Sequence, residues 1–395
     1  MTALLIAALG CAIWVYLLVA RGGFWRGIQR DDAPTPSAAH DPPWPRVLAV
    51  IPARDEAALI GQTVGSLLRQ DYRGTFALIV VDDHSTDGTA AAARQAAAAT
   101  GRSDRLTVLA APSLPDGWTG KLWAVNHGVS QAQAGPNPPD YLLLTDADIT
   151  FAADTLSSLV RRCVEDQLVL NSLMAKLRCQ SLAERGFIPA FIFFFQMLYP
   201  FAWVNRPDRR TAAAAGGCML VQRATLQAAG GLKAIRGELI DDCALARLLK
   251  GRGAIRLGLT ERVHSIRANA SLADIRHMVA RSAYAQLGFS PWLLVGTTAA
   301  MSVTFLAPPV LALLASGASQ WLGALAWALM ALAVQPLLRF YAVSPAWGPA
   351  LPVIAATYIG FTLDSAYQHW RGRGGAWKGR IHRAASARAA PGQGR

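Results

Sequence analysis

The sequence has little charge and few cysteines. Charged residues make up 16% of the 395 residues and hydrophobic residues 53%, which is less charge than a soluble protein usually carries. The cysteines form no Cys-x-x-Cys pair and leave an odd number. They are Cys11, Cys163, Cys179, Cys218 and Cys243. We therefore expect neither a disulfide framework nor a zinc knuckle, but reduced thiols facing a cytoplasmic environment.

Several common motifs are missing or incomplete. No internal repeat of about 20 to 50 residues is visible, which argues against solenoid folds. The stretch 83–88 is similar to the first half of an EF-hand loop, but Arg94 stands where the bidentate glutamate is required, so calcium is not expected. The Asp-Gly pair that ends this stretch is instead expected to form a turn before a helix, which Ser85 or Thr86 caps.

The positive net charge needs an explanation. A charge of +13 would suit a nucleic-acid-binding protein, but most arginines flank apolar blocks or are scattered, and no recognition helix or finger spacing is present. We therefore expect no nucleic-acid partner. Attraction to an anionic membrane surface explains the basic segment 369–395, which we predict to be a cytoplasmic tail.

Long apolar runs lie near both ends of the chain. The first, within 1–20, is long enough to span a bilayer at about 20 residues. Arg21, Arg26 and Arg30 follow this run rather than precede it, which favours an uncleaved anchor with its N-terminus outside. A linker rich in proline and charge is expected over 21–45.

A second apolar region is expected over 289–368. It has room for three membrane spans, or for two spans and an interfacial piece, and this count stays open. The basic tail favours an even count, and Asp364 argues against a third helix that faces lipid. The predicted location is the cytoplasmic membrane, with several spans and a domain in the cytoplasm.

Between these regions, residues 46–288 alternate strand-like and helix-like segments. This order predicts an α/β domain with a mainly parallel sheet covered by helices on both faces. Carboxylates follow three of the strand-like runs: Asp55, then Asp82 and Asp83, then Asp146 and Asp148. One such residue alone is as well explained by a turn or a helix cap. Three strand ends favour a shared cation or ribose site at one edge of the sheet.

Three more segments hold candidate residues. Lys121 follows a glycine-rich turn and could hold phosphate oxygens, although the Walker A spacing is absent and a surface lysine beside a capping turn explains it as well. Asp241 and Asp242 begin a helix, where they either complement the helix dipole or include a general base. A helix over 186–203 is apolar and is expected at a membrane surface or an acceptor channel.

Four segments in this order resemble one enzyme family. They are "VIPARDEA", "VVDDHSTDGT", "LTDAD" and "LIDDCALARLL", and together they resemble the membrane-associated family 2 glycosyltransferases, whose fold is called GT-A, a Rossmann-like mixed sheet. The resemblance covers about residues 47–287. It implies an inverting transfer of a sugar from a nucleotide diphosphate sugar to a membrane lipid.

The resemblance also assigns roles to residues. It places Pro52, Asp55, Asp82 and Asp83, with Lys121, Asp146 and Arg281, among the residues that bind the nucleotide sugar. It makes Asp146 and Asp148 the motif that holds Mg²⁺ or Mn²⁺ on the diphosphate. Asp242 matches the catalytic base, beside Asp241.

The later motif of processive synthases is not intact. Arg281 matches its arginine, but Ser282 stands in place of tryptophan and His277 only loosely matches glutamine. A single transfer to a lipid is therefore expected rather than polymer synthesis. Within the family, "GWTGKLWAV", "HMVARSAYAQL" and "WKGR" are most similar to the hopanoid-biosynthesis-associated glycosyltransferases, so a hopanoid or a related polycyclic or polyprenoid lipid is the expected acceptor. The alternative is a non-catalytic membrane protein that binds nucleotide sugar or lipid in a hopanoid pathway complex.

Overall fold

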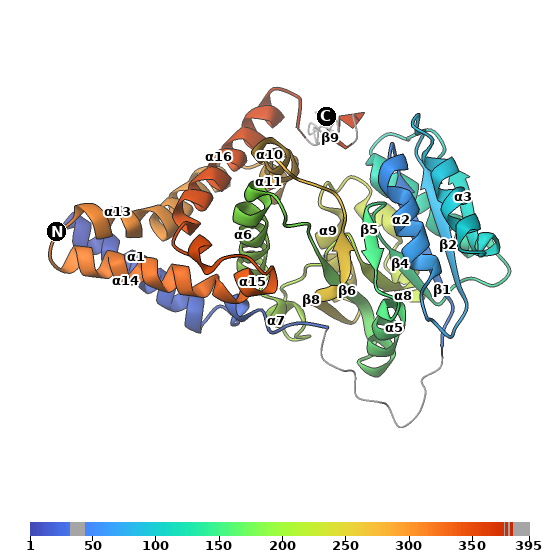
Figure 1. Ribbon diagram of the computed structural model, residues 1–395, viewed down its shortest axis with the longest axis horizontal. Coiled ribbons are helices and arrows are strands. Elements are labelled where there is room, and N and C mark those ends of the chain that lie inside the picture. The colour runs from blue at the N-terminus through green and yellow to red at the C-terminus, as the bar shows by residue number, and fades with distance from the viewer. Residues whose placement is uncertain (32–43, 375, 378–379, 382–395) are drawn as a thin grey trace, which may run out of the picture.

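The computed structural model describes residues 1–31, 44–374, 376–377 and 380–381 (Figure 1). Two parts are visible: a domain built on a sheet, and an arm of helices that holds the N-terminus. Residues 32–43 of the predicted linker and most of the predicted basic tail lie outside the described residues.

An eight-stranded sheet forms the core of the domain, in the order β3-β2-β1-β4-β7-β6-β8-β5. β1 is parallel to β2 and β4, and β2 is parallel to β3, whereas β7 is antiparallel to both of its neighbours. β6 and β8 are parallel, and β5 closes the edge antiparallel to β8. The strands are β1 (Val47–Ala53), β2 (Phe76–Asp82), β3 (Leu106–Ala110), β4 (Tyr141–Leu144), β5 (Ile149–Phe151), β6 (Leu168–Lys176), β7 (Met219–Gln222) and β8 (Ala254–Ser265).

Helices cover both faces of this sheet, and alternate strand residues point to each face. Val47, Ala49 and Ile51 of β1 share one hydrophobic cluster with α2 (Ala57–Leu68), α3 (Thr89–Ala99) and α5 (Thr155–Glu165). Val50 belongs to the other cluster, with α4 (Gly120–Ala134) and α9 (Asp241–Lys250). Strands buried on both faces need continuous apolar runs, which is why these segments show no polar alternation. The predicted α/β mixed sheet with helices on both faces is confirmed, but only its β3-β2-β1-β4 half is wholly parallel.

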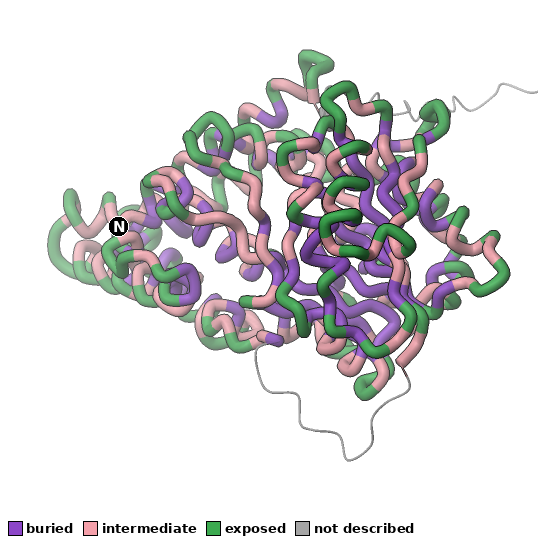
Figure 2. Tube along the Cα trace, turned by 45° about the vertical axis from the view of Figure 1, so that its right-hand side comes forward, coloured by how far each residue is buried: buried purple, intermediate pink, exposed green. Residues whose placement is uncertain are grey.

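The cluster that contains Val50, α4 and α9 continues from the sheet into the arm, so the sheet domain and the arm share one hydrophobic core. Figure 2 shows that buried segments are concentrated in the sheet domain and become sparser along the arm. The remaining helices and short strands are η1 (Phe24–Arg26), η2 (Ser103–Arg105), α6 (Leu182–Leu198), α7 (Phe201–Val204), α8 (Arg223–Ala228), η3 (Leu232–Ile235), α10 (Leu272–Ala280), α11 (Ala283–Gln286), η5 (Pro345–Trp347), α16 (Leu351–Trp370), β9 (Ala376–Trp377) and β10 (Arg380–Ile381).

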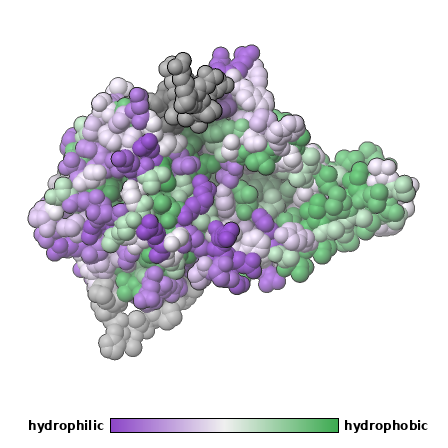
Figure 3. Space-filling view, turned by 180° about the vertical axis from the view of Figure 1, so that it is seen from behind, coloured by the Kyte–Doolittle hydropathy of each residue, from purple (hydrophilic) through white to green (hydrophobic). Residues whose placement is uncertain are grey.

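The arm contains three helices that are long and apolar enough to cross a membrane, judged by length and composition among the described residues. They are α1 (Thr2–Val19), the segment Pro291–Leu314 and the segment Ala318–Phe340. The second combines α12 (Pro291–Met301), the π-helix η4 (Ser302–Leu306) and α13 (Ala307–Leu314), and the third combines α14 (Ala318–Ala333) and α15 (Gln335–Phe340). Figure 3 shows their surface as one continuous apolar region. Apolar helices beyond both ends of the sheet domain were therefore predicted correctly.

Two polar contacts organise these helices. The Trp14 indole of α1 donates a hydrogen bond of 2.8 Å to the carbonyl oxygen of Thr304 in the π-helix, which satisfies both groups inside the apolar arm. α16 packs on α10 and α11, and its Asp364 accepts a hydrogen bond of 2.9 Å from Nε of Arg276. Asp364 therefore faces the protein, and α16 is not among the three candidate spans.

Two segments are packed more closely than the sequence led us to expect. In the predicted linker, Asp31 donates its backbone N–H to Leu259 of β8 at 3.1 Å, and Leu259 donates to Gln29 at 2.8 Å. The predicted surface helix, α6, lies between the sheet domain and α16 (Figure 1). Its Ser181 and Glu184 form a capping box, and Glu184 is fully buried.

Candidate active site

The end of β4 places the two aspartates of the Asp-x-Asp motif at the edge of the sheet. Thr145, directly after β4, donates a side-chain hydrogen bond of 2.7 Å to the carbonyl oxygen of Gly217. This contact ties the loop that holds Asp146 and Asp148 to the segment before β7. The loop then returns as β5, so both carboxylates stay at the carboxyl end of the parallel strands, where ligands bind in sheets of this type.

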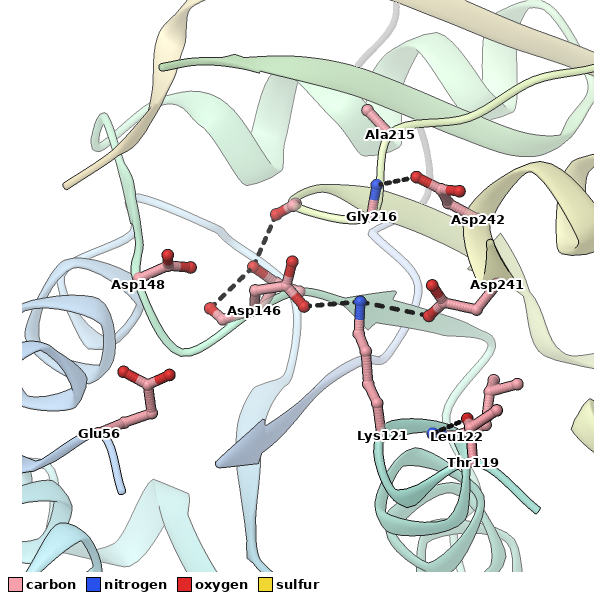
Figure 4. A network of polar contacts seen from close by, with 12 residues as sticks. Glu56, Thr119, Lys121, Leu122, Asp146, Asp148, Ala215, Gly216, Asp241 and Asp242 are labelled. Atoms are coloured by element: carbon pink, nitrogen blue, oxygen red, sulfur yellow. Dashed lines mark hydrogen bonds and ion pairs between the residues drawn. The ribbon is translucent and has the colours of Figure 1, made fainter. Parts of the chain in front are cut away.

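Lys121 joins this loop to the start of α9 (Figure 4). Its Nζ lies 2.9 Å from Oδ1 of Asp146 and 3.2 Å from Oδ2 of Asp241. Thr119 caps α4 by accepting from the backbone N–H of Leu122, so a capping turn is present, but the lysine beside it points into the site. Burial alone would lower the pKa of Lys121, but the neighbouring carboxylates of Asp146 and Asp241 outweigh it and raise the pKa. Lys121 is therefore held protonated.

Asp242 is held in a fixed orientation by two backbone donors. Gly216 donates its N–H to Oδ2 at 3.0 Å, and Cys243 donates to Oδ1 at 2.7 Å. Burial and the adjacent Asp241 raise the pKa of Asp242 to about 6, and Lys121 partly offsets this rise. A carboxylate with a pKa near neutrality suits proton abstraction, because it is ionised at neutral pH yet still basic.

Gly216 makes the close approach of these groups possible. A Cβ at this position would lie 3.3 Å from Nζ of Lys121 and 3.6 Å from Oδ2 of Asp242. A Cβ here would therefore press on the lysine ammonium group and come into van der Waals contact with the aspartate. The segment that holds this glycine is consequently a third wall of the site, together with the loop after β4 and the start of α9.

Asp148 is held by an arginine that the sequence reading did not single out. Arg267, just after β8, donates from Nε to Asp148 at 2.7 Å and from Nη2 to Glu56 at 2.6 Å. The side chain of Asp148 is 13% exposed and that of Glu56 8%. Burial and Asp146 raise the pKa of Asp148, while Arg267 opposes that rise. One guanidinium is therefore shared by two nearly buried carboxylates.

A divalent metal fits this arrangement only together with a substrate. Among the described residues, no group of three or more His, Cys, Asp or Glu side chains is placed to enclose a metal ion. Mg²⁺ and similar ions, however, are commonly held by one or two carboxylates, with the rest of the shell made of substrate phosphates and water. Asp146 and Asp148 supply two such carboxylates on one loop. The residues present fit a metal that binds with a diphosphate.

Hydrogen bonds link the loops after β1 and β2. Oδ1 of Asp55 accepts the backbone N–H of Thr86 at 2.9 Å, and Oδ1 of Asp82 accepts that of Ser85 at 2.9 Å. Asp83 is 1% exposed and lies 3.6 Å from the Arg54 guanidinium. These aspartates thus meet at the sheet edge as the strand pattern predicted.

The capping prediction for the following helix was wrong. The N-cap of α3 is Gly88 at a φ of 89°, without a side-chain cap. Asp87 instead accepts the backbone N–H groups of Thr89 at 3.0 Å and Ala57 at 2.9 Å. Its two oxygens join the starts of α2 and α3, which a hydroxyl of Ser85 or Thr86 could not do alone.

Comparison with known proteins agrees with this geometry. Residues 48–227 match the family model described as Glycosyl transferase family 2. This region is a family 2 glycosyltransferase domain. The prediction of a family 2 glycosyltransferase is thereby confirmed at the level of the domain. No curated protein sequence matches the chain.

Solved structures share the fold. The mannosyltransferase PcManGT from Pyrobaculum calidifontis, solved with GDP-Man and Mn²⁺, is similar over 93% of this chain and 99% of its own, at 21% identity and a TM-score of 0.54. S. aureus TarS matches over 60% of this chain and 40% of its own, at 17% identity and a TM-score of 0.40. M. tuberculosis glucosyl-3-phosphoglycerate synthase matches over 60% and 78%, at 20% identity and 0.36. At these identities the likeness concerns the fold alone, and PcManGT extends it beyond the family 2 domain.

Three candidate residues lie away from the cluster around Lys121. Pro52 is buried within β1, paired in register with Val81 of β2. Arg281 lies at the end of α10, in the wall of a separate cavity of about 510 Å³ that also contains Tyr284. His277 is exposed on α10. In the described part of the chain, no hydrogen bond or ion pair links Arg281 to the Asp-x-Asp loop.

The sequence reading missed Glu56, Arg267 and Gly216. Glu56 is part of the quoted "VIPARDEA" segment and directly follows the candidate Asp55, so its position at a strand end was a usable signal. Gly216 begins a Gly-Gly pair before an apolar run, which is also a recognisable turn signal. Nothing local distinguishes Arg267 from other arginines, because its partners are 119 and 211 residues away in the sequence.

Proposed function

We propose that the protein transfers a sugar, with inversion, from a nucleotide diphosphate sugar to a hydroxyl of a membrane lipid. The observation that carries this proposal is the bridge through Lys121. Its Nζ contacts one carboxylate of each part, Asp146 of the Asp-x-Asp loop at 2.9 Å and Asp241 at the start of α9 at 3.2 Å. A diphosphate site and a general base are thus adjacent, as a direct displacement at the sugar requires.

The proposed binding site for the nucleotide sugar lies at the carboxyl ends of the strands. Asp55, Asp82 and Asp83 lie in loops at the carboxyl ends of β1 and β2, where the nucleoside would bind, with Pro52 beneath them in β1. Asp146 and Asp148 would hold Mg²⁺ or Mn²⁺, which neutralises negative charge on the diphosphate. Lys121 adds a fixed positive charge where the leaving group develops its own charge.

Asp242 is the proposed base. Its carboxylate removes the proton from the acceptor hydroxyl as that oxygen bonds to the anomeric carbon of the sugar. The bond from this carbon to the diphosphate oxygen breaks at the same time, and the nucleoside diphosphate leaves with the electron pair. One displacement inverts the anomeric configuration and needs no covalent enzyme intermediate. The backbone donors from Gly216 and Cys243 keep the carboxylate in place during this step.

The lipid acceptor is supported by the arm. Its three apolar helices share a hydrophobic core with the sheet domain, so a domain of this kind would work at the bilayer surface. Arg21, Arg26 and Arg30 follow α1, which favours a cytoplasmic domain at the inner membrane, with an anionic surface nearby. The sequence resemblance makes a hopanoid or a related polycyclic or polyprenoid lipid the proposed acceptor, glycosylated once.

One experiment tests the proposal directly. Membranes containing the full chain are incubated with Mn²⁺, lipid extract and a panel of isotope-labelled nucleotide sugars, and the lipids are analysed by mass spectrometry. We expect one labelled glycolipid, together with an equal amount of free nucleoside diphosphate. If a nucleotide sugar binds but no labelled lipid forms with any member of the panel, the non-catalytic binding protein is the better description.

A further inference from the structure

The cavity that contains Arg281 and Tyr284 lies next to the start of α9, where Asp241 and Asp242 are found. Its volume is about 510 Å³, within the range of sites for small molecules. Four parts of the chain surround it: the turn before α4, the loop before α9, the junction of α10 and α11, and the end of α16. The side chains that the argument uses are Trp118, Glu238, Arg247, Arg281, Tyr284 and Phe289.

This cavity adjoins the proposed base. Ile240 lines it and immediately precedes Asp241 and Asp242 at the start of α9. On another wall, Gln286 donates a hydrogen bond of 2.7 Å to the hydroxyl of Tyr199. The start of α9 therefore forms part of the cavity wall, and the proposed base follows Ile240 by two residues in the chain.

Several polar groups of the cavity have no partner among the residues that the structure describes. Arg247, Arg281 and Glu238 are exposed, and none has a hydrogen bond or an ion pair from its side chain among the residues that the structure describes. Tyr284 is only 1% exposed, yet its hydroxyl has no hydrogen-bond partner in the same set. Buried hydroxyl groups are nearly always bonded, because leaving one unbonded is costly. A ligand that bonds Tyr284 would remove this cost.

The types of polar group limit the kinds of ligand that the cavity can bind. The arginines donate, Glu238 accepts, and a tyrosine hydroxyl can do both. A single anion would be attracted by the arginines but repelled by Glu238, and it would fill little of the cavity. Several hydroxyl groups use donors and acceptors together, and Trp118 adds an aromatic face against which a polyol or sugar can pack.

The opposite end of the cavity leads towards the candidate membrane helices. Phe289 is 41% exposed, and its ring stacks on His369 of α16 at 4.4 Å. Two residues beyond it α12 begins, and there Trp292 is 85% exposed. Exposed aromatic side chains at the end of an apolar helix are typical of the membrane interface. The lining of the cavity thus runs from Ile240, beside the proposed base, to Phe289, beside the first residues of the apolar helix α12.

We propose that this cavity binds the polyhydroxylated head group of an amphiphilic acceptor, whose apolar body leaves past Phe289 along α12. This inference rests on the proposed function and specifies its acceptor site. Arg281 then serves the acceptor head group rather than the diphosphate. Tyr284 and Arg281 determine which head group is accepted.

The test uses the full chain in lipid nanodiscs, without any nucleotide sugar. The probe is decyl glucoside with a photoactivatable diazirine next to the glycosidic oxygen, and the labelled peptides are identified by mass spectrometry. We expect saturable labelling of the cavity wall between Arg281 and Trp292. Unlabelled decyl glucoside should compete, and decyl phosphate should compete at least about tenfold less well, by the loss of one or two hydrogen bonds and the repulsion from Glu238.

Two variants and one control make the test specific. Tyr284→Phe and Arg281→Gln should each weaken competition by decyl glucoside about five- to tenfold, because each removes a hydrogen bond to the ligand. Arg252→Gln, an exposed arginine just after α9 that does not line the cavity, should leave it unchanged. Labelling that is not saturable, or that is unchanged in both variants, overturns the inference, and equal competition by decyl phosphate overturns the polyhydroxylated head group.

Failure of this inference can be told apart from failure of the proposed function. Labelling does not require sugar transfer, so a labelled cavity in a protein that glycosylates no lipid would leave the cavity as a binding site and refute the transfer. Conversely, a glycolipid formed at unchanged KM for the acceptor in Tyr284→Phe and Arg281→Gln would support the transfer and refute this cavity as its acceptor site.

Discussion

The two ends of the candidate site differ in how their polar groups are satisfied. At the donor end, the protein supplies its own partners: Arg267 holds Asp148 and Glu56, and Lys121 holds Asp146 and Asp241. At the acceptor end, the arginines of the cavity and the buried hydroxyl of Tyr284 have no such partners among the described residues. The donor end is therefore organised before a ligand arrives, which suits electrostatic stabilisation of a transition state, whereas the acceptor end depends on its ligand.

The largest effect is expected where the two ends meet, at Asp242. Asp242→Asn keeps the size of the side chain but removes its basicity, so the transfer rate should fall about 10²- to 10⁴-fold. Transfer of labelled sugar to lipid at saturating donor measures this rate. Asp104→Asn, on the short helix η2 away from the site, is the matched control and should keep full activity. Near-normal turnover of a folded Asp242→Asn protein would contradict the assignment of the base.

Removing Lys121 should damage the donor end next. Lys121→Met leaves Asp146 and Asp241 facing each other without their shared cation. After allowance for partial exposure, we expect a loss of about 2 kcal/mol in the free energy of unfolding, and weaker binding of nucleotide diphosphate. Denaturant unfolding and calorimetric titration measure the two effects.

Lys233→Met provides the comparison, because Lys233 is exposed on η3. A Lys121→Met protein that matched this control in both measurements would show that the bridge is a surface contact without consequence for the donor end.

The contacts of Arg267 with Asp148 and Glu56 predict that a divalent cation can replace the guanidinium. Arg267→Gln removes the guanidinium that Asp148 and Glu56 share, which should cost about 1 to 3 kcal/mol of stability. Because a divalent ion can replace the lost charge, Mn²⁺ together with GDP should raise the melting temperature of the variant more than that of the unaltered protein. Arg276→Gln breaks an ion pair of similar length with Asp364 outside the site and should show no such extra response to Mn²⁺. An identical Mn²⁺ response in all three proteins would argue against a metal near Asp148.

The raised pKa of Asp242 predicts a pH dependence. Its carboxyl group must be ionised to act as a base, and with a pKa of about 6 the transfer rate should fall as the pH drops through 6. The sign for stability is opposite. Ionisation of Asp242 is disfavoured in the fold, so this group costs stability at high pH, and the cost decreases as the pH falls from 6 towards the usual carboxyl pKa of about 4. Rate and unfolding measurements between about pH 5 and 8 test both signs. A rate that stays constant down to pH 5 would rule out Asp242 as the titrating base.

The smallest effect concerns two tyrosines. Tyr284→Phe removes a buried hydroxyl without a partner, so the stability of the ligand-free protein should be unchanged or slightly higher. Tyr358→Phe removes a hydroxyl that donates to the carbonyl oxygen of Phe187 at 2.8 Å, and should cost about 1 kcal/mol. Denaturant unfolding of the two variants side by side tests this difference. Equal losses would mean that the hydroxyl of Tyr284 is satisfied within the protein.

The donor end was easier to predict from the sequence than the acceptor end. Apolar strand runs end at Asp55, Asp82 and Asp146, so local patterns were enough to gather these residues at one edge of the sheet. The contacts of Arg267 depend on pairing between distant strands, which no local pattern reveals. The acceptor cavity is formed by four separate segments of the chain, which no local pattern brings together. In addition, Arg281 lies between two helices, because α10 ends at Ala280 and α11 begins at Ala283.

The antiparallel strands were also beyond local prediction. β7 is a short apolar run like its neighbours, and it follows the loop that brings Gly216 to Asp242. Strand propensity indicates where a strand lies but not its direction. The predicted mixed sheet is therefore present, but no local pattern indicated that β7, beside the third wall of the site, is antiparallel to both of its neighbours.

The backbone pairing of Gln29 and Asp31 with Leu259 limits the distance between the end of α1 and the sheet domain. Only a short stretch, 20–28, separates α1 from this pairing, and it comes before residues 32–43 in the chain. The distance from the end of α1 to β8 is therefore limited by those few residues. Under the proposed function, this short connection determines how deep in the membrane an acceptor hydroxyl must lie to reach Asp242.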